Sequence, residues 1–287
     1  MKLGAIKGAL ASLVFLNAGM LAHAERPTRL VSLGSSNTEI IYALEAADAV
    51  VGVDSTSLLP PQALATKANV GYLRALSAEG LMALRPDVVL TSAGAGPPEV
   101  LENLRRAGIK IVNLDDVASA ESLLHRIDAI GQLVERESAA QRLHADVAQR
   151  FDSLTASVAK IANRKRVLLV LGMQSGRAMV AGQKTAADAM INLAGAVNAG
   201  SGMDGYKPMS DEAIVAAAPD VIIWVHRPGE DVVKDVFALP AFATTPAAAT
   251  KAIVHMDAVY LLGFGPSAPD AAKDLMRQIY GDGAVAK

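Results

Sequence analysis

The chain has 287 residues, of which 52% are hydrophobic and 20% are charged, and its formal net charge is −2. This composition is typical of one large or two medium globular domains and excludes a disordered or fibrous chain. The near-neutral charge argues against a nucleic-acid or anionic-membrane partner bound through bulk charge. The absence of cysteine excludes disulfides, cysteine-bound metals, thiol catalysis and a lipid attached to an N-terminal cysteine.

Residues 1–24 have the pattern of a secretory signal peptide. Lys2 and Lys7 form a basic start, residues 9–16 form a short apolar stretch, and Ala22-His23-Ala24 fits an A-x-A cleavage site. A short membrane anchor is the alternative, but the apolar stretch is short for a membrane span. Cleavage removes two lysines and no acidic residue, which changes the formal net charge from −2 to −4. We therefore expect an exported monomer that is free in the periplasm and not anchored in the membrane.

Short apolar strands alternate with helical segments in residues 25–118. The sequence predicts strands near 29–34, 50–54, 87–91 and 110–114, and helices near 36–44, 77–84 and 99–107. Ser36 and Glu39 have capping-box spacing, which predicts that they close the start of the first helix. This alternation is typical of a mainly parallel sheet, so we expect a Rossmann-like α/β lobe over residues 25–118.

Residues 119–164 differ in character from the segments on either side. Apolar residues such as Leu143, Val147 and Phe151 recur at helical spacing, which predicts a helix near 119–134 and a long helix near 137–161. A second α/β series begins with the strand predicted near 166–171, so we expect a second Rossmann-like lobe over residues 165–287. Two lobes joined by one long helix would leave a ligand cleft between them.

An internal repeat supports the prediction of two lobes. Residues 77–90 align without gaps on residues 210–223, at an offset of 133, with the shared pattern S-x-E-x-[LI]-x-A-x-x-P-D-V-[VI]-[LI]. The strands that begin at Arg29 and Arg166 correspond at an offset of 137. A repeat of this period indicates two similar lobes rather than a solenoid. Convergence on a stable helix–turn–strand unit is the alternative.

Five segments of the chain carry a resemblance to a known family. They read LGSSNTEI (33–40), VGVDSTS (51–57), VGYLRALS (70–77), DGYKPMS (204–210) and LLGFGP (261–266). Nearly all of the mature chain resembles the periplasmic haem-binding proteins of ABC haem importers, within the class of substrate-binding proteins that have a rigid interlobe helix. The resemblance implies a protein without catalytic activity that captures haem and delivers it to an ABC-type permease.

The resemblance matches Tyr72 to the axial tyrosine that binds haem iron in this family. Independently of the match, ferric iron is a hard acid for which a phenolate oxygen is a suitable ligand. Arg74 lies two residues further on and is the candidate to hydrogen-bond the phenolate or a haem propionate. A loop tyrosine that only packs on its lobe is the alternative for Tyr72.

The second half of the chain supplies a similar pair of candidates. Tyr206 precedes Ser210 by four residues, much as Tyr72 precedes Ser77 by five, so we expect Tyr206 to face the cleft. It would contact the porphyrin or bind a second haem. Lys207 is a candidate to pair with a carboxylate of the ligand.

Two further candidates follow the strand predicted over residues 221–225, because open α/β sheets bind ligands at the carboxyl ends of their strands. Arg227 is a candidate for a propionate contact, since a guanidinium matches a carboxylate in bidentate fashion. His226 is a candidate sixth iron ligand or haem-edge contact, and a partly exposed strand-end histidine is the alternative. Ser267 stands where close relatives usually have arginine, so the resemblance carries no site role over to that segment.

Glu79 and Glu212 occupy equivalent positions in the repeat. In the class that the chain resembles, one surface glutamate on each lobe docks with arginines of the membrane permease. The resemblance therefore implies that Glu79 and Glu212 are the docking residues. Two ordinary solvated glutamates, favoured by the electrostatics of the first helical turn, are the alternative.

Two other functions remain as alternatives at this point. One is a corrinoid or ferric-siderophore binding protein of an ABC importer, although such ligands arrive with their metal coordination largely satisfied. The other is a chelatase-like enzyme on a similar two-lobed scaffold. The sequence has no G-x-S-x-G elbow and no P-loop, and its five scattered histidines give no zinc-ligand cluster.

Overall fold

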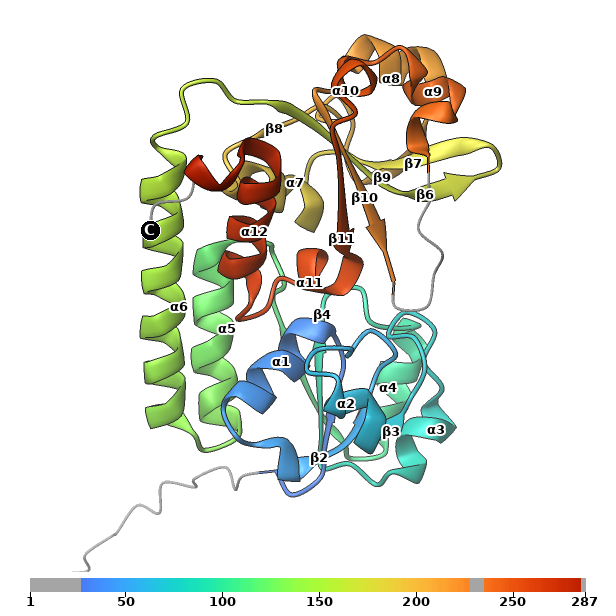
Figure 1. The fold of residues 1–287 in the computed structure, drawn as a ribbon. Helices are drawn as coiled ribbons and strands as arrows, with labels where there is room; N and C mark the ends of the chain where they lie inside the picture. Colours follow the sequence, from blue (N-terminus) through green and yellow to red (C-terminus); the bar gives the residue numbers. More distant parts are fainter. Residues whose placement is uncertain (1–26, 228–234, 285–287) are drawn as a thin grey trace, which may run out of the picture.

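The computed structural model describes residues 27–227 and 235–284. The expected signal peptide, residues 1–24, lies outside the described residues. The rest of the chain forms two α/β lobes, one above the other in Figure 1, with a pair of helices running along one side of both.

The first lobe is built on a parallel sheet with the strand order β3-β2-β1-β4-β5. Every residue of its central strand β1 and of the neighbouring β4 is buried, because helices cover both faces of a sheet of this kind. The elements of this lobe are β1 (Leu30–Ser32), α1 (Ser35–Ala43), η1 (Ala47–Ala49), β2 (Val50–Val53), α2 (Gln62–Thr66), β3 (Ala68–Asn69), α3 (Ala78–Ala83), β4 (Val88–Ser92), α4 (Pro98–Arg106) and β5 (Lys110–Leu114).

The second lobe has a mixed sheet with the order β11-β10-β6-β7-β9, and β8 pairs with β6 outside this path. The β6–β7 and β7–β9 pairs are antiparallel and the others are parallel. The elements are β6 (Arg166–Gln174), β7 (Arg177–Ala181), α7 (Ala186–Leu193), β8 (Val197–Asn198), β9 (Tyr206–Met209), α8 (Asp211–Ala217), β10 (Val221–His226), η2 (Val236–Ala238), α9 (Pro240–Ala243), α10 (Pro246–Thr250), β11 (Ile253–Asp257), α11 (Ala258–Leu262), α12 (Ala268–Tyr280) and η3 (Asp282–Ala284). The predicted architecture of two α/β lobes with largely parallel sheets is therefore confirmed.

Two helices connect the lobes. Helix α5 (Ala120–Leu133) packs along α6 (Glu137–Val158), and the 22 residues of α6 give it a length of about 33 Å. The helices approach so closely that a Cβ at Gly131 would overlap the Cβ of Ala140. One buried apolar cluster continues from the first lobe through α5 and α6 into the second, so the core shows no break at the expected boundaries. The domain boundaries near residues 118 and 165 stay predictions.

The internal repeat is also a structural repeat. The side chain of Arg29 donates to the carbonyl of Leu84 (3.1 Å), and Arg166 donates in the same way to Ala217 (2.9 Å). The carboxylates of Asp87 and Asp220 accept the backbone N–H groups of those two arginines at 2.9 and 2.8 Å. In both lobes, the same side-chain hydrogen bonds therefore connect the repeated helix and its following turn to the neighbouring strand.

The predicted capping box at Ser36 and Glu39 is wrong. The residue before α1 is Gly34, and no side chain caps this helix. The Ser36 hydroxyl donates to the carbonyl of Phe264 (3.0 Å), and the Glu39 carboxylate accepts the N–H of Ser267 (2.7 Å). Both side chains thus bridge the first lobe to the second, because tertiary partners replace the local ones that their spacing predicted.

Candidate functional site

Tyr72 lies in the irregular loop between β3 and α3. The backbone of this loop is bonded on two sides: Ser55 donates to the carbonyl of Gly71 (2.9 Å), and Gly96 donates to that of Leu73 (2.9 Å). Gly71 has a φ of +88°, a conformation that favours glycine. The Tyr72 side chain is 48% exposed. The loop therefore holds the backbone of Tyr72 firmly while its phenol projects into solvent.

Arg74 reaches across to a neighbouring turn. A Cβ placed on Gly94 would lie 3.9 Å from the guanidinium carbon of Arg74. The carboxyl group of Asp116 is near enough to be affected: burial raises the pKa of Asp116, while the charges of Arg126 and Arg74 act to lower it. The support that Arg74 is expected to give to a phenolate or propionate stays a prediction.

Tyr206 lies on β9, opposite Ala181 of β7, and is 38% exposed. Burial raises the pKa of the Tyr206 phenol, and the polar groups of Ala187 and Thr185 at the start of α7 act to lower it. This environment favours the protonated phenol, so a ring contact with a ligand suits Tyr206 better than iron binding. Lys207 follows on the same strand and is exposed.

His226 is the last residue of β10 and pairs in register with Asp257 of β11. Burial and the charge of His226 lower the pKa of His255, which lies on the neighbouring strand β11. Arg227 follows as an exposed residue directly after the strand. In Figure 1 the carboxyl end of β10 faces the first lobe, as the prediction of ligand contacts from these two residues requires.

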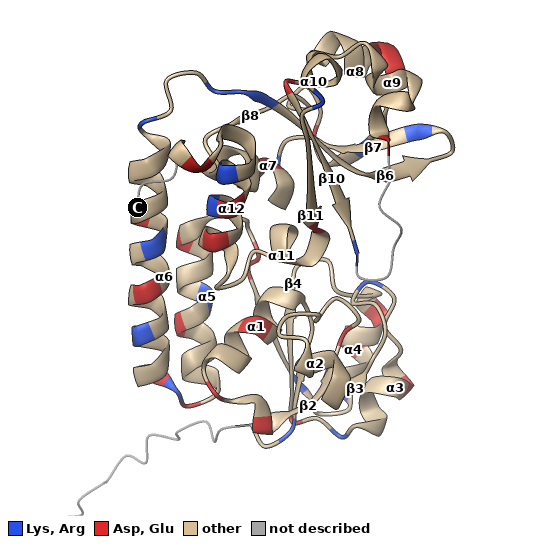
Figure 2. Cartoon of the chain, in the orientation of Figure 1, with Lys and Arg blue, Asp and Glu red and all other residues tan. Residues whose placement is uncertain are grey.

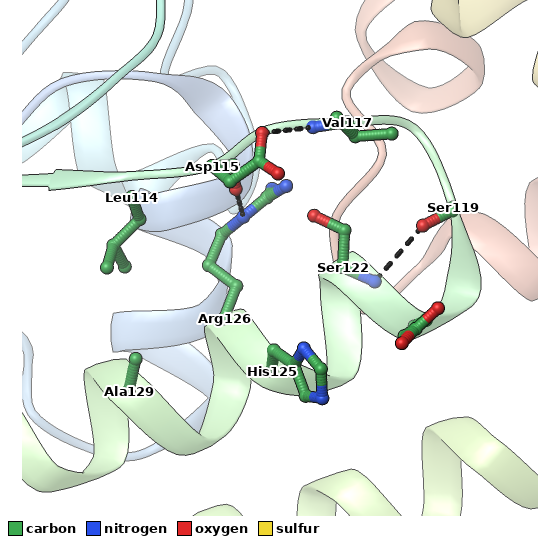
Figure 3. A pocket seen from close by; sticks show the side chains of 9 residues that line it. Leu114, Asp115, Val117, Ser119, Ser122, His125, Arg126 and Ala129 are labelled. Atoms are coloured by element: carbon green, nitrogen blue, oxygen red, sulfur yellow. Dashed lines mark hydrogen bonds between the residues drawn. The ribbon is translucent and has the colours of Figure 1, made fainter.

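A pocket of about 390 Å³ lies elsewhere, between the β5–α5 loop and α5 (Figure 3). At its edge the buried Arg126 donates to the carbonyl of Asp115 (3.1 Å) and to the hydroxyl of Ser36 (2.6 Å). Sequence reasoning missed Arg126, although a charged residue on the apolar face of α5 is a signal for it. The predicted ligand-binding residues do not line this pocket, and its charged lining is mixed, with Asp115 and Glu121 beside Arg126.

Glu79 and Glu212 are exposed in the first turns of α3 and α8. The preceding Ser77 and Ser210 accept backbone N–H groups of those turns, each at 3.3 Å. Backbone and Ser210 hydrogen bonds lower the pKa of Glu212, which keeps its charge at neutral pH. The two glutamates are thus presented by the same local structure.

Charged residues of both signs are interspersed along α5, α6 and α12 (Figure 2), in line with the small net charge. Attraction for an anionic ligand must therefore come from individual cationic side chains. Over residues 27–227 and 235–284, no three His, Asp or Glu side chains gather closely enough to hold a metal ion. No helix in the same ranges is long and apolar enough to cross a membrane.

The sequence profile described as "Periplasmic binding protein" matches residues 30–260. The chain belongs to this family of periplasmic substrate-binding proteins, whose fold agrees with the two lobes described above.

Several solved structures are similar over nearly the whole chain. The periplasmic haem-binding protein BhuT in complex with two haems is 38% identical with a TM-score of 0.83, covering 91% of this chain and 100% of that one. The haem-binding protein RhuT from Roseiflexus sp. RS-1 in apo form is 35% identical (TM-score 0.82; 90% and 99% covered). The periplasmic haem-binding protein HutB of Vibrio cholerae is 35% identical (TM-score 0.79; 88% and 99% covered).

Sequence relatives are more distant. The uncharacterised ABC transporter substrate-binding lipoprotein YvrC of Bacillus subtilis is 28% identical over 202 residues, which are 69% of this chain and 64% of that protein. The vitamin B12-binding protein of Photorhabdus laumondii is 28% identical over 145 residues, which are 50% of this chain and 52% of that protein. The match thus spans between half and two thirds of the length of these relatives.

Proposed function

We propose that this protein captures haem in the periplasm and delivers it to an ABC-type haem permease. The observation that carries the proposal is the exposed phenol of Tyr72 on a loop held by its backbone, in a chain similar to three haem-binding structures. A phenolate oxygen suits ferric iron, and the described residues offer no metal-ligand cluster that would compete for it.

The other predicted residues have complementary roles in this proposal. Arg74, Lys207 and Arg227 pair with the haem propionates or support the phenolate, since cationic side chains near the ligand must supply an attraction that the net charge does not. Tyr206 and His226 contact the porphyrin. Glu79 and Glu212 dock with the permease. The signal peptide directs the protein to the periplasm, where it acts as a free monomer without catalysing a reaction.

The experiment is a titration of the mature protein with ferric haem, followed by absorption spectroscopy. The wild type should bind stoichiometrically and show the charge-transfer bands of high-spin ferric haem with a phenolate ligand. Tyr72→Phe, which removes one oxygen atom, should lose these bands. Its dissociation constant for haem should rise at least about tenfold, which corresponds to a loss of about 1.4 kcal/mol in binding free energy. Tyr206→Phe is the matched control and should keep the bands.

A wild-type protein that binds no haem stoichiometrically would contradict the proposal. Vitamin B12-binding proteins among the sequence relatives make a corrinoid the second candidate ligand. Tight binding of cyanocobalamin without binding of haem would establish that alternative. If Tyr206→Phe loses the phenolate bands and Tyr72→Phe keeps them, the assignment of the iron ligand is wrong while haem capture stands.

A further inference from the structure

Two exposed apolar side chains stand at equivalent positions in the two lobes. Met82 on α3 and Val215 on α8 are each 40% exposed, and they are separated by 133 residues, the offset of the repeat. Each lies three residues after the exposed glutamate of its helix, Glu79 or Glu212. Residues three apart on a helix lie on the same face, so each lobe presents a carboxylate beside an apolar side chain.

The two helices hold these side chains in the same way. Leu81 and Ile214, one position before the apolar residue, are completely buried and fix the rotation of each helix. Each helix ends at a turn with a left-handed residue at the same place in the repeat, Arg85 with a φ of 46° and Ala218 with a φ of 44°. Burial and backbone geometry therefore repeat together with the sequence.

The position of the helices fits a partner that contacts both. In Figure 1, α3 and α8 lie near opposite ends of the molecule, on the side away from α6. A partner built from two identical subunits presents the same surface twice, and one chain can match both copies only with two similar patches of its own. Carboxylates on both patches call for a basic group in each copy.

We infer that Met82 and Val215 add an apolar contact to each of the two docking sites proposed at Glu79 and Glu212, and that both patches bind a two-fold symmetric membrane permease. Each permease subunit would offer a basic side chain next to an apolar hollow. The inference rests on the proposed function and adds the apolar half of each contact. The exposed charges speed and orient the encounter, whereas burial of the apolar side chains slows dissociation.

The test uses polar substitutions of similar size, Met82→Gln and Val215→Thr, in the mature protein. Binding to the purified permease complex in nanodiscs is followed by surface plasmon resonance. Each substitution should raise the dissociation rate constant about threefold to tenfold with little change in the association rate constant. The double variant should show about the product of the two effects, because the patches are separate.

The chain offers matched controls outside the patches. Met173 and Val197 are 43% and 37% exposed, and neither lies in the repeated unit. Met173→Gln and Val197→Thr should leave both rate constants unchanged. Glu79→Gln and Glu212→Gln should instead lower the association rate constant, with a weaker dependence on salt than the wild type has.

The inference is overturned if Met82→Gln and Val215→Thr dissociate no faster than the controls, or if only one of them has an effect. Haem titration and a urea unfolding curve on each variant keep the outcomes separate. If the patch variants bind haem and their rate constants for the permease equal those of the wild type, the docking inference alone is overturned. Absence of haem binding in the wild type, with faster dissociation of the patch variants from the permease, overturns the proposed ligand and leaves the docking patches standing.

Discussion

Replacement of Glu39 tests the polar bridge between the two lobes. Glu39 lies on α1, and its carboxylate accepts the N–H of Ser267 at the start of α12 (2.7 Å). Burial raises the pKa of Glu39, the hydrogen bonds from Ser267 and the charge of Arg150 act to lower it, and Asp270 raises it further. Since the pKa is raised overall, this environment favours the neutral form of the carboxyl group.

Two substitutions separate the hydrogen bond from the charge. Glu39→Ala leaves the Ser267 N–H without its acceptor and should lower the free energy of unfolding by about 1–3 kcal/mol. Glu39→Gln keeps an oxygen that can accept this bond and removes the buried charge. Its free energy of unfolding at pH 7 should therefore lie within about 1 kcal/mol of the wild-type value or exceed it.

The pH dependence follows from the direction of the pKa shift. A carboxyl group with a raised pKa binds its proton more tightly in the folded state, so stability falls as pH rises from the unfolded pKa through the folded one. The unfolded value is 4.5, and the window lies above it. Glu39→Gln removes this contribution, so its stability relative to the wild type should increase from pH 4.5 to pH 7.

Urea unfolding at several pH values measures the loss of the hydrogen bond and the pH dependence. Fluorescence of the single tryptophan, the buried Trp224, follows the unfolding. The reasoning is refuted if Glu39→Gln loses as much stability as Glu39→Ala at pH 7. A constant difference between Glu39→Gln and the wild type across the pH range would refute the role of desolvation.

Two further sets of substitutions test the repeat and the helix pair, again by urea unfolding. The Asp87 carboxylate accepts three hydrogen bonds from residues 28–29, whereas that of Asp220 accepts one within the described residues. Asp87→Ala should therefore lower the free energy of unfolding by about 1–2 kcal/mol, and Asp220→Ala by about 0.5–1 kcal/mol. These bonds lower the pKa of Asp87, so its contribution is lost as pH falls through the folded pKa; equal losses in the two variants would contradict this account. Gly131→Ala should lower the free energy of unfolding by about 1–3 kcal/mol despite the better helix propensity of alanine, because the new methyl group overlaps Ala140. Adding Ala140→Gly to the same chain should restore most of this loss.

The sequence predicted elements whose signals are local. The strand predicted over residues 110–114 matches β5, and the helix predicted near 77–84 matches α3 to within one residue at each end, because alternation, apolar runs and helical periodicity act within a few residues. The strand expected over 166–171 continues to Gln174 and turns at Ser175-Gly176 into β7, which was not predicted. The last four residues of β6, 171–174, are less buried than residues 167–170, so the apolar signal fades before the strand ends.

Residues with distant partners could not be predicted in this way. Ser36 and Glu39 have the spacing of a local cap, but their partners lie 228 residues away, and no local pattern distinguishes the two arrangements. Arg126 bonds to Ser36 across 90 residues for the same reason. Tyr72 was identified through the resemblance, Tyr206 through its spacing to Ser210, and His226 and Arg227 through their place after a predicted strand. The contacts of these residues with a ligand stay predictions.

The two tyrosines mark where the repeat ends. Tyr72 projects from an irregular loop, whereas Tyr206 lies on β9, where burial raises the pKa of its phenol. The following helices, by contrast, repeat in cap, burial and final turn. A single iron ligand requires that the lobes differ where they meet the haem, and a two-fold symmetric partner requires that they agree where they meet the permease. In the proposed function, the different settings of the two tyrosines meet the first requirement, and the matching structure of α3 and α8 meets the second, in separate parts of the chain.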